Sequence, residues 1–179
     1  MKNARAIQVT TPNTVEPIDM RTHSAQQTQQ FGGLLAPLLR SGDVICLEGS
    51  LGAGKTCLTQ GIGRGLGITA SITSPTFVIV HEYGLPQRPY RLYHIDLYRI
   101  ESAAEASATG LEDYIFGDGI CVIEWADRIV DILPEDRLWI TMSYLGDSER
   151  QLSLRAQGWR YAELLQQLAD RLGESSLLA

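Results

Sequence analysis

The eight residues from Gly49 to Thr56, GSLGAGKT, match the spacing G-x-x-x-x-G-K-[ST] of a phosphate-binding loop, or P-loop. Glycines at positions 52 and 54 let phosphate oxygens approach backbone N–H groups, because a Cβ there would obstruct them. Lys55, one of two lysines in the chain, is a compact charge that can reach between the β- and γ-phosphates. Thr56 places a hydroxyl where a Mg²⁺ ion bridging those phosphates needs an oxygen ligand. The motif predicts nucleotide contacts along the loop, at Gly49, Ser50, Leu51, Gly52, Ala53, Gly54, Lys55, Thr56 and Cys57.

Two carboxylates are placed to complete a hydrolytic site, which needs an acidic group near the metal and a group that orients water. Asp96 ends the segment RLYHID and Glu124 ends GICVIE, so each is expected at the C-terminal end of a strand. Ligands of open α/β sheets bind along that edge. Each carboxylate could instead be a solvated charge, but two of them in one P-loop protein favour a metal site. His94, on the same strand face as Asp96, is interpreted as a structural residue rather than a catalytic base.

A Ser/Thr-rich turn and two arginines are further candidates for phosphate contacts. In TSPTF (73–77) the hydroxyls, especially that of Thr76, could sense the γ-phosphate, although a plain turn would have the same composition. Arg91 and Arg99 could each contact phosphate or simply be surface residues. A guanine-reading NKxD motif is absent, and the one DxxG stretch, Asp170 to Gly173, lies in the terminal helix. ATP is therefore the expected nucleotide.

The elements that must position these residues follow from hydrophobic periodicity and turn signals. Residues 43–49 form an apolar run that predicts a buried strand before the P-loop, and a helix is expected from about residue 54 to the glycines of GRGLG. The β-branched and aromatic segments 75–83 and 90–99 predict two strands of a hairpin around the turn GLPQRP. Residues 119–125 predict another buried strand.

The C-terminal half alternates further helices and strands. Residues 101–115 are expected to be helical in their first half, and residues 133–144 to turn into a strand. The alternating pattern of residues 150–158 is typical of an edge strand. Residues 159–172 predict an amphipathic helix. Its apolar face is expected to hold Trp159, Leu164 or Leu165, Leu168 and Leu172.

The N-terminal region divides into an extension and the first elements of the domain. Residues 1–17 are polar and predict a flexible extension. A short strand is expected at 18–22, and Ser24 starts a helix with Gln27 three residues later, as in a capping box. We expect an α/β P-loop NTPase fold: a single three-layer domain over 18–157 with a central mixed, mainly parallel sheet, followed by a C-terminal helix and tail over 158–179.

Composition limits the classes of function. A chain of 179 residues with net charge −6 is suited to one domain and argues against a broad electrostatic grip on nucleic acid or anionic lipid. Three cysteines without a CxxC pair or Cys/His cluster argue against a disulfide framework and a structural zinc site. No signal pattern and no apolar stretch of about 18 residues occurs, so a cytoplasmic location is expected.

Four motifs of the chain together resemble those of a known family. GSLGAGKT, SPTF…HEY, YHIDLYR and ICVIEW, in this order and spacing, resemble the TsaE family of small bacterial ATPases that help make the threonylcarbamoyladenosine modification of tRNA. The resemblance runs from about residue 18 to 157, with its motifs between 46 and 128. It implies a Mg²⁺ site served by Thr56 and Glu124, with Asp96 beside the metal. It also implies that Lys55 holds the phosphates and that Trp125 lies by the nucleotide.

The resemblance also carries expectations about partners. The segment Ser74 to Thr76 would act as a switch, and the protein would bind a heterodimer of TsaB and TsaD proteins. Its ATP hydrolysis would be slow until the partners complete the site, and it would reset that complex. The protein would contact tRNA only through the partners. The chain departs from the family pattern at two positions: it has Ser50 where many members have an acidic residue, and Ala126 where proline is common. Neither position is one of the implied metal ligands.

Two other functions remain open on the residues alone. A small-molecule kinase could use the same P-loop, although the short connections show no arginine-bearing lid over an acceptor. A nucleotide-sensing module that barely hydrolyses ATP would need the same P-loop and Mg²⁺ ligands, so the motifs do not separate it from an ATPase.

Overall fold

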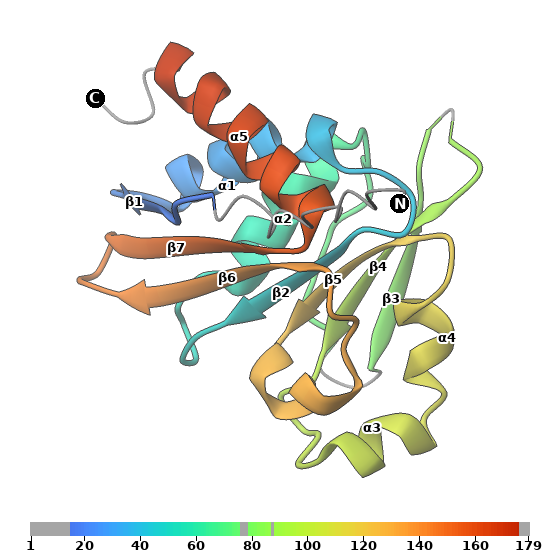
Figure 1. Ribbon diagram of the computed structural model, residues 1–179. Coiled ribbons are helices and arrows are strands. Elements are labelled where there is room, and N and C mark those ends of the chain that lie inside the picture. Colours follow the sequence, from blue (N-terminus) through green and yellow to red (C-terminus); the bar gives the residue numbers. More distant parts are fainter. Residues whose placement is uncertain (1–14, 76–78, 87, 176–179) are drawn as a thin grey trace, which may run out of the picture.

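A seven-stranded sheet forms the middle layer of the computed structural model, which describes residues 15–75, 79–86 and 88–175 (Figure 1). In spatial order the strands are β1 (Ile18–Thr22), β7 (Arg150–Gln157), β6 (Arg137–Tyr144), β2 (Val44–Glu48), β5 (Ile120–Glu124), β4 (Arg91–Asp96) and β3 (Val80–Gly84). The four central strands β6, β2, β5 and β4 run parallel, and antiparallel pairings add β7 with β1 at one edge and β3 at the other. The expected mixed sheet is confirmed.

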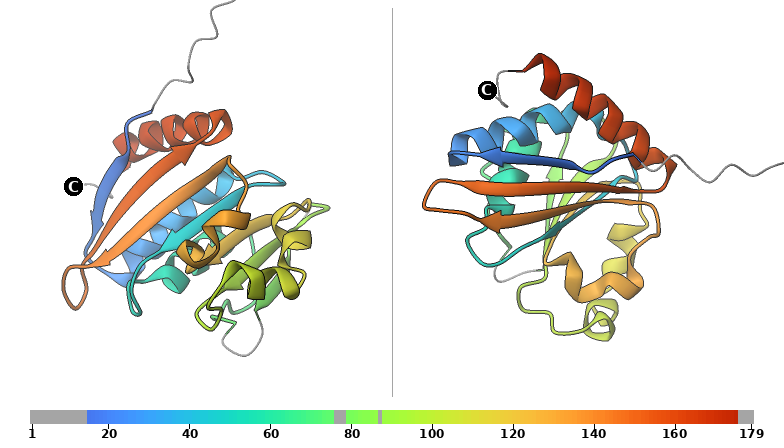
Figure 2. Two further views of the ribbon diagram at one scale, coloured as in Figure 1. Left: turned by 60° about the horizontal axis from the view of Figure 1, so that its bottom comes forward. Right: turned by 60° about the vertical axis from the view of Figure 1, so that its left-hand side comes forward.

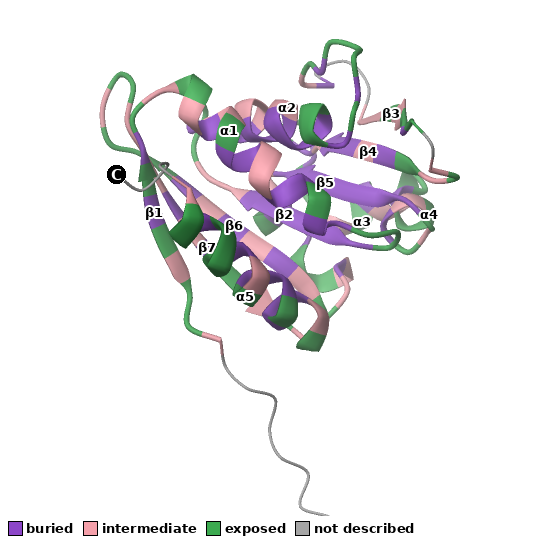
Figure 3. Cartoon of the chain, turned by 90° about the horizontal axis from the view of Figure 1, so that it is seen from above, coloured by how far each residue is buried: buried purple, intermediate pink, exposed green. Residues whose placement is uncertain are grey.

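Helices cover both faces of the sheet, as the views in Figure 2 show. One layer consists of α1 (Ala25–Leu35), the 3₁₀ turn η1 (Ala36–Leu38), α2 (Lys55–Gly65) and α5 (Trp159–Glu174). The other consists of α3 (Ala103–Ala108), α4 (Leu111–Ile115) and η2 (Ala126–Ile132). Each layer packs its own hydrophobic core against the sheet. Strands β2 and β5 lie between the two cores and are buried almost throughout, which explains their unbroken apolar sequences (Figure 3).

Two glycines bring α1 and α2 into close contact. A Cβ on Gly32 of α1 would lie 2.6 Å from the Leu58 carbonyl oxygen of α2, and a Cβ on Gly61 of α2 would meet the Gln29 carbonyl of α1. The helix start expected at Ser24 is confirmed, since its hydroxyl accepts the Gln27 N–H at 3.1 Å. Helix α1 therefore supports α2, the helix that begins at the P-loop lysine.

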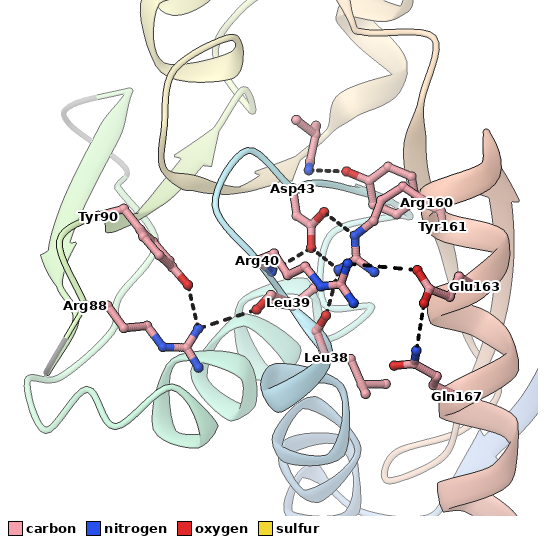
Figure 4. A network of polar contacts seen from close by, with 11 residues as sticks. Leu38, Leu39, Arg40, Asp43, Arg88, Tyr90, Arg160, Tyr161, Glu163 and Gln167 are labelled. Atoms are coloured by element: carbon pink, nitrogen blue, oxygen red, sulfur yellow. Dashed lines mark hydrogen bonds and ion pairs between the residues drawn. The ribbon is translucent and has the colours of Figure 1, made fainter.

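The C-terminal helix is tied to the start of β2 by a polar network (Figure 4). The hydroxyl of Tyr161 accepts the Val44 N–H at 2.6 Å, and burial raises the pKa of this tyrosine. The guanidinium of Arg160 donates to both carboxylate oxygens of Asp43, at 3.0 and 2.6 Å, and to the Leu38 carbonyl at 2.7 Å. These contacts anchor the first turn of α5 at the end of β2 that lies opposite the P-loop.

Three expectations from the sequence are wrong in detail. Strand β7 is not an edge strand, because β1 pairs on its outer side; its alternation arises because its Leu152 face is buried under helices while the opposite face is not. Trp159 does not join the buried face of α5, where Tyr161 and Ala162 lie instead, and is 68% exposed. Residues 101–115 are helical in both halves, because Gly110 adopts φ +75° and allows a second helix to start.

Candidate functional site

The loop between β2 and α2 has a backbone that glycine makes possible. Gly52 has φ +80° and Gly54 has φ +101°, values that L side chains rarely adopt. A Cβ on Gly49 would also collide with the carbonyl oxygen of Met142 in β6. Helix α2 starts at Lys55, directly after Gly54. The unpaired N–H groups and positive dipole end of this helix therefore lie at the loop, which suits a phosphate group.

Lys55 is held among groups of the loop and an aromatic ring. Its ammonium donates to the carbonyls of Gly49 at 2.5 Å and Ser50 at 3.0 Å, and lies 3.8 Å from the ring centroid of Trp125. Burial lowers the pKa of Lys55 below its ordinary value of 10.5, while the negative charges of Glu124 and Asp96 act in the opposite direction. The carbonyls of Gly49 and Ser50 therefore hold the ammonium of Lys55 in place by hydrogen bonds.

A chain of hydrogen bonds joins α2 to the two strands that carry the predicted carboxylates. The Thr56 hydroxyl donates to Oε1 of Glu124 at 2.8 Å, and Nε2 of His94 lies 2.8 Å from the same oxygen. Glu124 is 3% exposed and His94 is fully buried. The threonine of the P-loop and the carboxylate at the end of β5 are thus brought together, as the motifs predict.

Asp96 lies beside this chain, where β4 and β5 end next to each other. The register pairs Asp96 with Glu124 across the two parallel strands. Its Oδ2 accepts the hydroxyl of Ser74, and its Oδ1 accepts the Tyr98 N–H at 2.9 Å. Asp96 therefore links the end of β4 to the predicted switch segment, whereas Glu124 contacts the P-loop itself. Thr76 of that segment lies outside the described residues.

Trp125 follows Glu124 in a strained conformation. Its φ of +61° is the one positive φ of a non-glycine residue in the described part of the chain. The guanidinium of Arg128 lies 5.1 Å from its ring on one side, and Tyr98 packs against it with ring centroids 5.4 Å apart. Arg128 also donates to three carbonyls, those of Leu97, Tyr98 and Ile100. This arginine holds the loop after β4 against the tryptophan.

These groups line a cavity of about 430 Å³ at the C-terminal ends of β2, β4 and β5. The predicted residues along its wall are Leu51, Gly52, Gly54, Lys55, Thr56, Cys57, Asp96, Glu124 and Trp125, and the candidate Arg99 is there too. Gly49, Ser50 and Ala53 do not line the cavity: Ala53 is fully buried, whereas Ser50 is exposed. Arg91 lies at the other end of β4, 3.8 Å from Glu82, so that candidate is not at the site.

Sequence reasoning missed several parts of this wall. Ile79, Tyr98 and Ile100 give the cavity an apolar side together with Pro75 of the predicted switch segment, and Arg128 organises the loop that carries Tyr98 and Ile100. Tyr98 follows Asp96 by two residues, so its proximity in sequence was an available signal. The role of Arg128 depends on three backbone carbonyls and carries no motif of its own.

The donor set suits a nucleotide with a hard divalent cation. The oxygens on the cavity wall that suit a metal ion include the Thr56 hydroxyl and the carboxylates of Glu124 and Asp96. Within the described ranges, no three His, Cys, Asp or Glu side chains gather closely enough to hold a metal ion alone. Mg²⁺ is commonly held by one or two carboxylates together with phosphate oxygens, so the residues present fit a Mg²⁺–nucleotide complex.

Comparison with known proteins agrees with this geometry. The model of the family described as threonylcarbamoyl adenosine biosynthesis protein TsaE matches residues 22–152. The chain belongs to the TsaE family. A Bacillus subtilis relative named tRNA threonylcarbamoyladenosine biosynthesis protein TsaE is 42% identical over 155 residues, which cover 87% of this chain and 96% of the relative. A Treponema pallidum relative of the same name is 39% identical over 133 residues, or 74% of this chain and 96% of the relative.

A solved structure supports the fold independently. The crystal structure of Bacillus subtilis YdiB matches with a TM-score of 0.75 at 38% identity and covers 89% of this chain and 98% of its own. The expected P-loop NTPase-like α/β fold is confirmed by this match, and the P-loop of a TsaE family member indicates a nucleotide-binding role. Every helix of the described segments is too short or too polar to cross a bilayer.

Proposed function

We propose that the protein is a Mg²⁺-dependent ATPase that acts in the threonylcarbamoyladenosine modification of tRNA. The observation that carries the proposal is the 2.8 Å contact between the Thr56 hydroxyl of the P-loop and Glu124 of β5, which joins two expected metal ligands beside Lys55. The TsaE relatives, which are named for threonylcarbamoyladenosine biosynthesis, supply the pathway. Bound Mg²⁺ would neutralise charge that develops on the phosphates during hydrolysis.

Each residue has a distinct part in this proposal. The backbone of residues 49–57 and Lys55 bind the phosphates, and Thr56 and Glu124 hold the metal. Asp96 supports the metal site and, through its hydrogen bond with Ser74, senses the position of the switch segment. Trp125 lies against Lys55 and is available to pack beside the nucleotide.

The proposal includes partners. We infer that the protein binds a heterodimer of TsaB and TsaD and resets it by hydrolysing ATP, with tRNA contacted through the complex. A cytoplasmic location is part of the proposal and agrees with three free thiols, Cys46, Cys57 and Cys121. Slow hydrolysis by the isolated protein is expected, as in other P-loop sites that a partner completes.

The test is ATP turnover by the purified protein, alone and with a TsaB–TsaD heterodimer, with Lys55→Ala as the control. We expect slow turnover that rises at least about tenfold with the partners and is lost in the variant. Absence of any rise would reject the partner-activated ATPase, and phosphorylation of small hydroxyl acceptors would then be screened to test a kinase. Glu124→Ala separates an ATPase from a nucleotide sensor: a sensor would retain normal partner control without turnover.

A further inference from the structure

A fully buried histidine lies directly behind the proposed metal ligand. His94 of β4 is 0% exposed, and its Nε2 is 2.8 Å from Oε1 of Glu124, which is itself 3% exposed. We propose that His94 is a positioning residue that fixes the orientation of the Glu124 carboxylate for the Mg²⁺–nucleotide complex. The inference rests on the proposed function and gives a role to a side chain that the sequence patterns suggested was merely structural.

The contacts of the ring determine which nitrogen carries hydrogen. Nε2 must donate, because its partner is a carboxylate oxygen that can only accept when ionised. The other ring nitrogen, Nδ1, is buried and has no hydrogen-bond partner among the described residues. His94 is therefore a directed donor to Glu124.

The sheet places this donor where it can control rotation of the carboxylate. His94 is paired with Val122 across the parallel strands β4 and β5, so Glu124 lies two residues further along β5 on the same face. The terminal torsion of a glutamate is broad, and a free carboxylate exchanges its two oxygens readily. Hydrogen bonds from His94 and Thr56 both engage Oε1. They hold the carboxylate plane in one orientation, and Oε2 accepts no hydrogen bond from the described residues.

This arrangement has a clear consequence for the metal. The Thr56 hydroxyl would itself be a ligand of the metal, whereas His94 touches only Glu124 and would act on the metal solely through the orientation of that carboxylate. Groups that hydrogen-bond to metal ligands typically change metal affinity or activity by about 10–100-fold when removed. Loss of the His94 donor should therefore weaken metal binding more than binding of the nucleotide itself.

Variants at position 94 separate positioning from filling of the core. His94→Gln keeps an N–H donor near the place of Nε2, His94→Asn keeps one only near the place of Nδ1, and His94→Leu keeps none. Leu92→Val is a matched control, because Leu92 is fully buried on the same face of β4 and makes no polar side-chain contact. Four quantities are measured: Mn²⁺ affinity of the nucleotide complex by electron paramagnetic resonance, ATP affinity in EDTA, turnover, and melting temperature.

We expect His94→Leu and His94→Asn to weaken Mn²⁺ affinity at least about tenfold, with ATP affinity in EDTA changed by less than about threefold. His94→Gln should recover most of the loss, and Leu92→Val should keep the wild-type affinities for Mn²⁺ and ATP although the lost methylene lowers its melting temperature. Equal Mn²⁺ affinity in His94→Gln and His94→Asn would overturn the inference, and this comparison stands even where His94→Leu does not fold. A wild-type protein without turnover would instead count against the proposed ATPase, whatever the variants do.

Discussion

Replacing Gly32 by alanine inserts a methyl group between α1 and the helix that begins at the P-loop. The new Cβ would lie 2.6 Å from the Leu58 carbonyl oxygen and 2.7 Å from the Ile62 nitrogen, both backbone atoms of α2. An ordinary contact begins at 3.4 Å, so the helices must separate by several tenths of an ångström. Overpacking of this kind costs about 2–3 kcal/mol, and the better helix propensity of alanine returns about 1 kcal/mol.

The expected net loss is about 1.5 kcal/mol, or about 3–6 °C in melting temperature for a chain of this size. Gly33→Ala is the matched control, because a Cβ at the next position of the same helix meets nothing within 4 Å. It should stabilise the protein by about 0.5–1 kcal/mol. Thermal and urea unfolding measure both effects. Because α2 starts at Lys55, Gly32→Ala should also weaken ATP binding. Equal stability of the two variants would refute the close helix contact.

Three further predictions follow from individual contacts. Glu124→Gln keeps the size of the metal-binding side chain but removes its charge, so ATP turnover should fall at least about 100-fold. ATP should still bind, which isothermal titration calorimetry would show. Undiminished turnover would contradict the role of Glu124 in metal binding. Burial raises the pKa of Cys46 and of Cys121 to about 12, so at pH 8 a thiol reagent should label only Cys57 in the folded protein. ATP should slow the labelling because Cys57 lines the cavity. Rapid labelling of all three thiols would show that the fold is looser than described. Asp43→Ala removes the carboxylate partner of the mostly buried Arg160 and should lower the free energy of unfolding by about 3 kcal/mol. Urea unfolding measures this change, and an unchanged midpoint would mean that the ion pair contributes nothing.

The parts of the fold that the sequence predicts are those with strong local signals. The P-loop lies between β2 and α2 as expected, because glycine spacing, an apolar run and a helix start coincide within 43–65. The hairpin of β3 and β4 and the buried strand β5 are also as expected, since β-branched and aromatic residues and the turn between the hairpin strands are local signals. Thr56 and Glu124 are 68 residues apart in the sequence. They meet because α2, which carries Thr56, follows β2, and β2 pairs with β5, which ends at Glu124.

Features that depend on distant pairing escape sequence reasoning. Strand β1 covers the outer side of β7, whose residues come more than 100 positions later in the chain, so the alternating pattern of β7 alone suggested an edge. Trp159 is apolar yet exposed, because it lies on the side of α5 that carries the exposed Glu163 and Gln166, opposite the buried face. Arg128 stabilises the loop after β4 through backbone carbonyls, which leave no trace in residue type.

The most direct test of the central claim is the threonylcarbamoyladenosine content of tRNA, measured by mass spectrometry in bacteria depleted of their own TsaE protein. Expression of the wild-type chain should restore the modified nucleoside. Glu124→Gln, which should bind ATP without hydrolysing it, should leave the nucleoside at the depleted level. Full restoration by Glu124→Gln would contradict the account, because it would mean that the site described around Thr56 and Glu124 does not need to hydrolyse ATP for the modification.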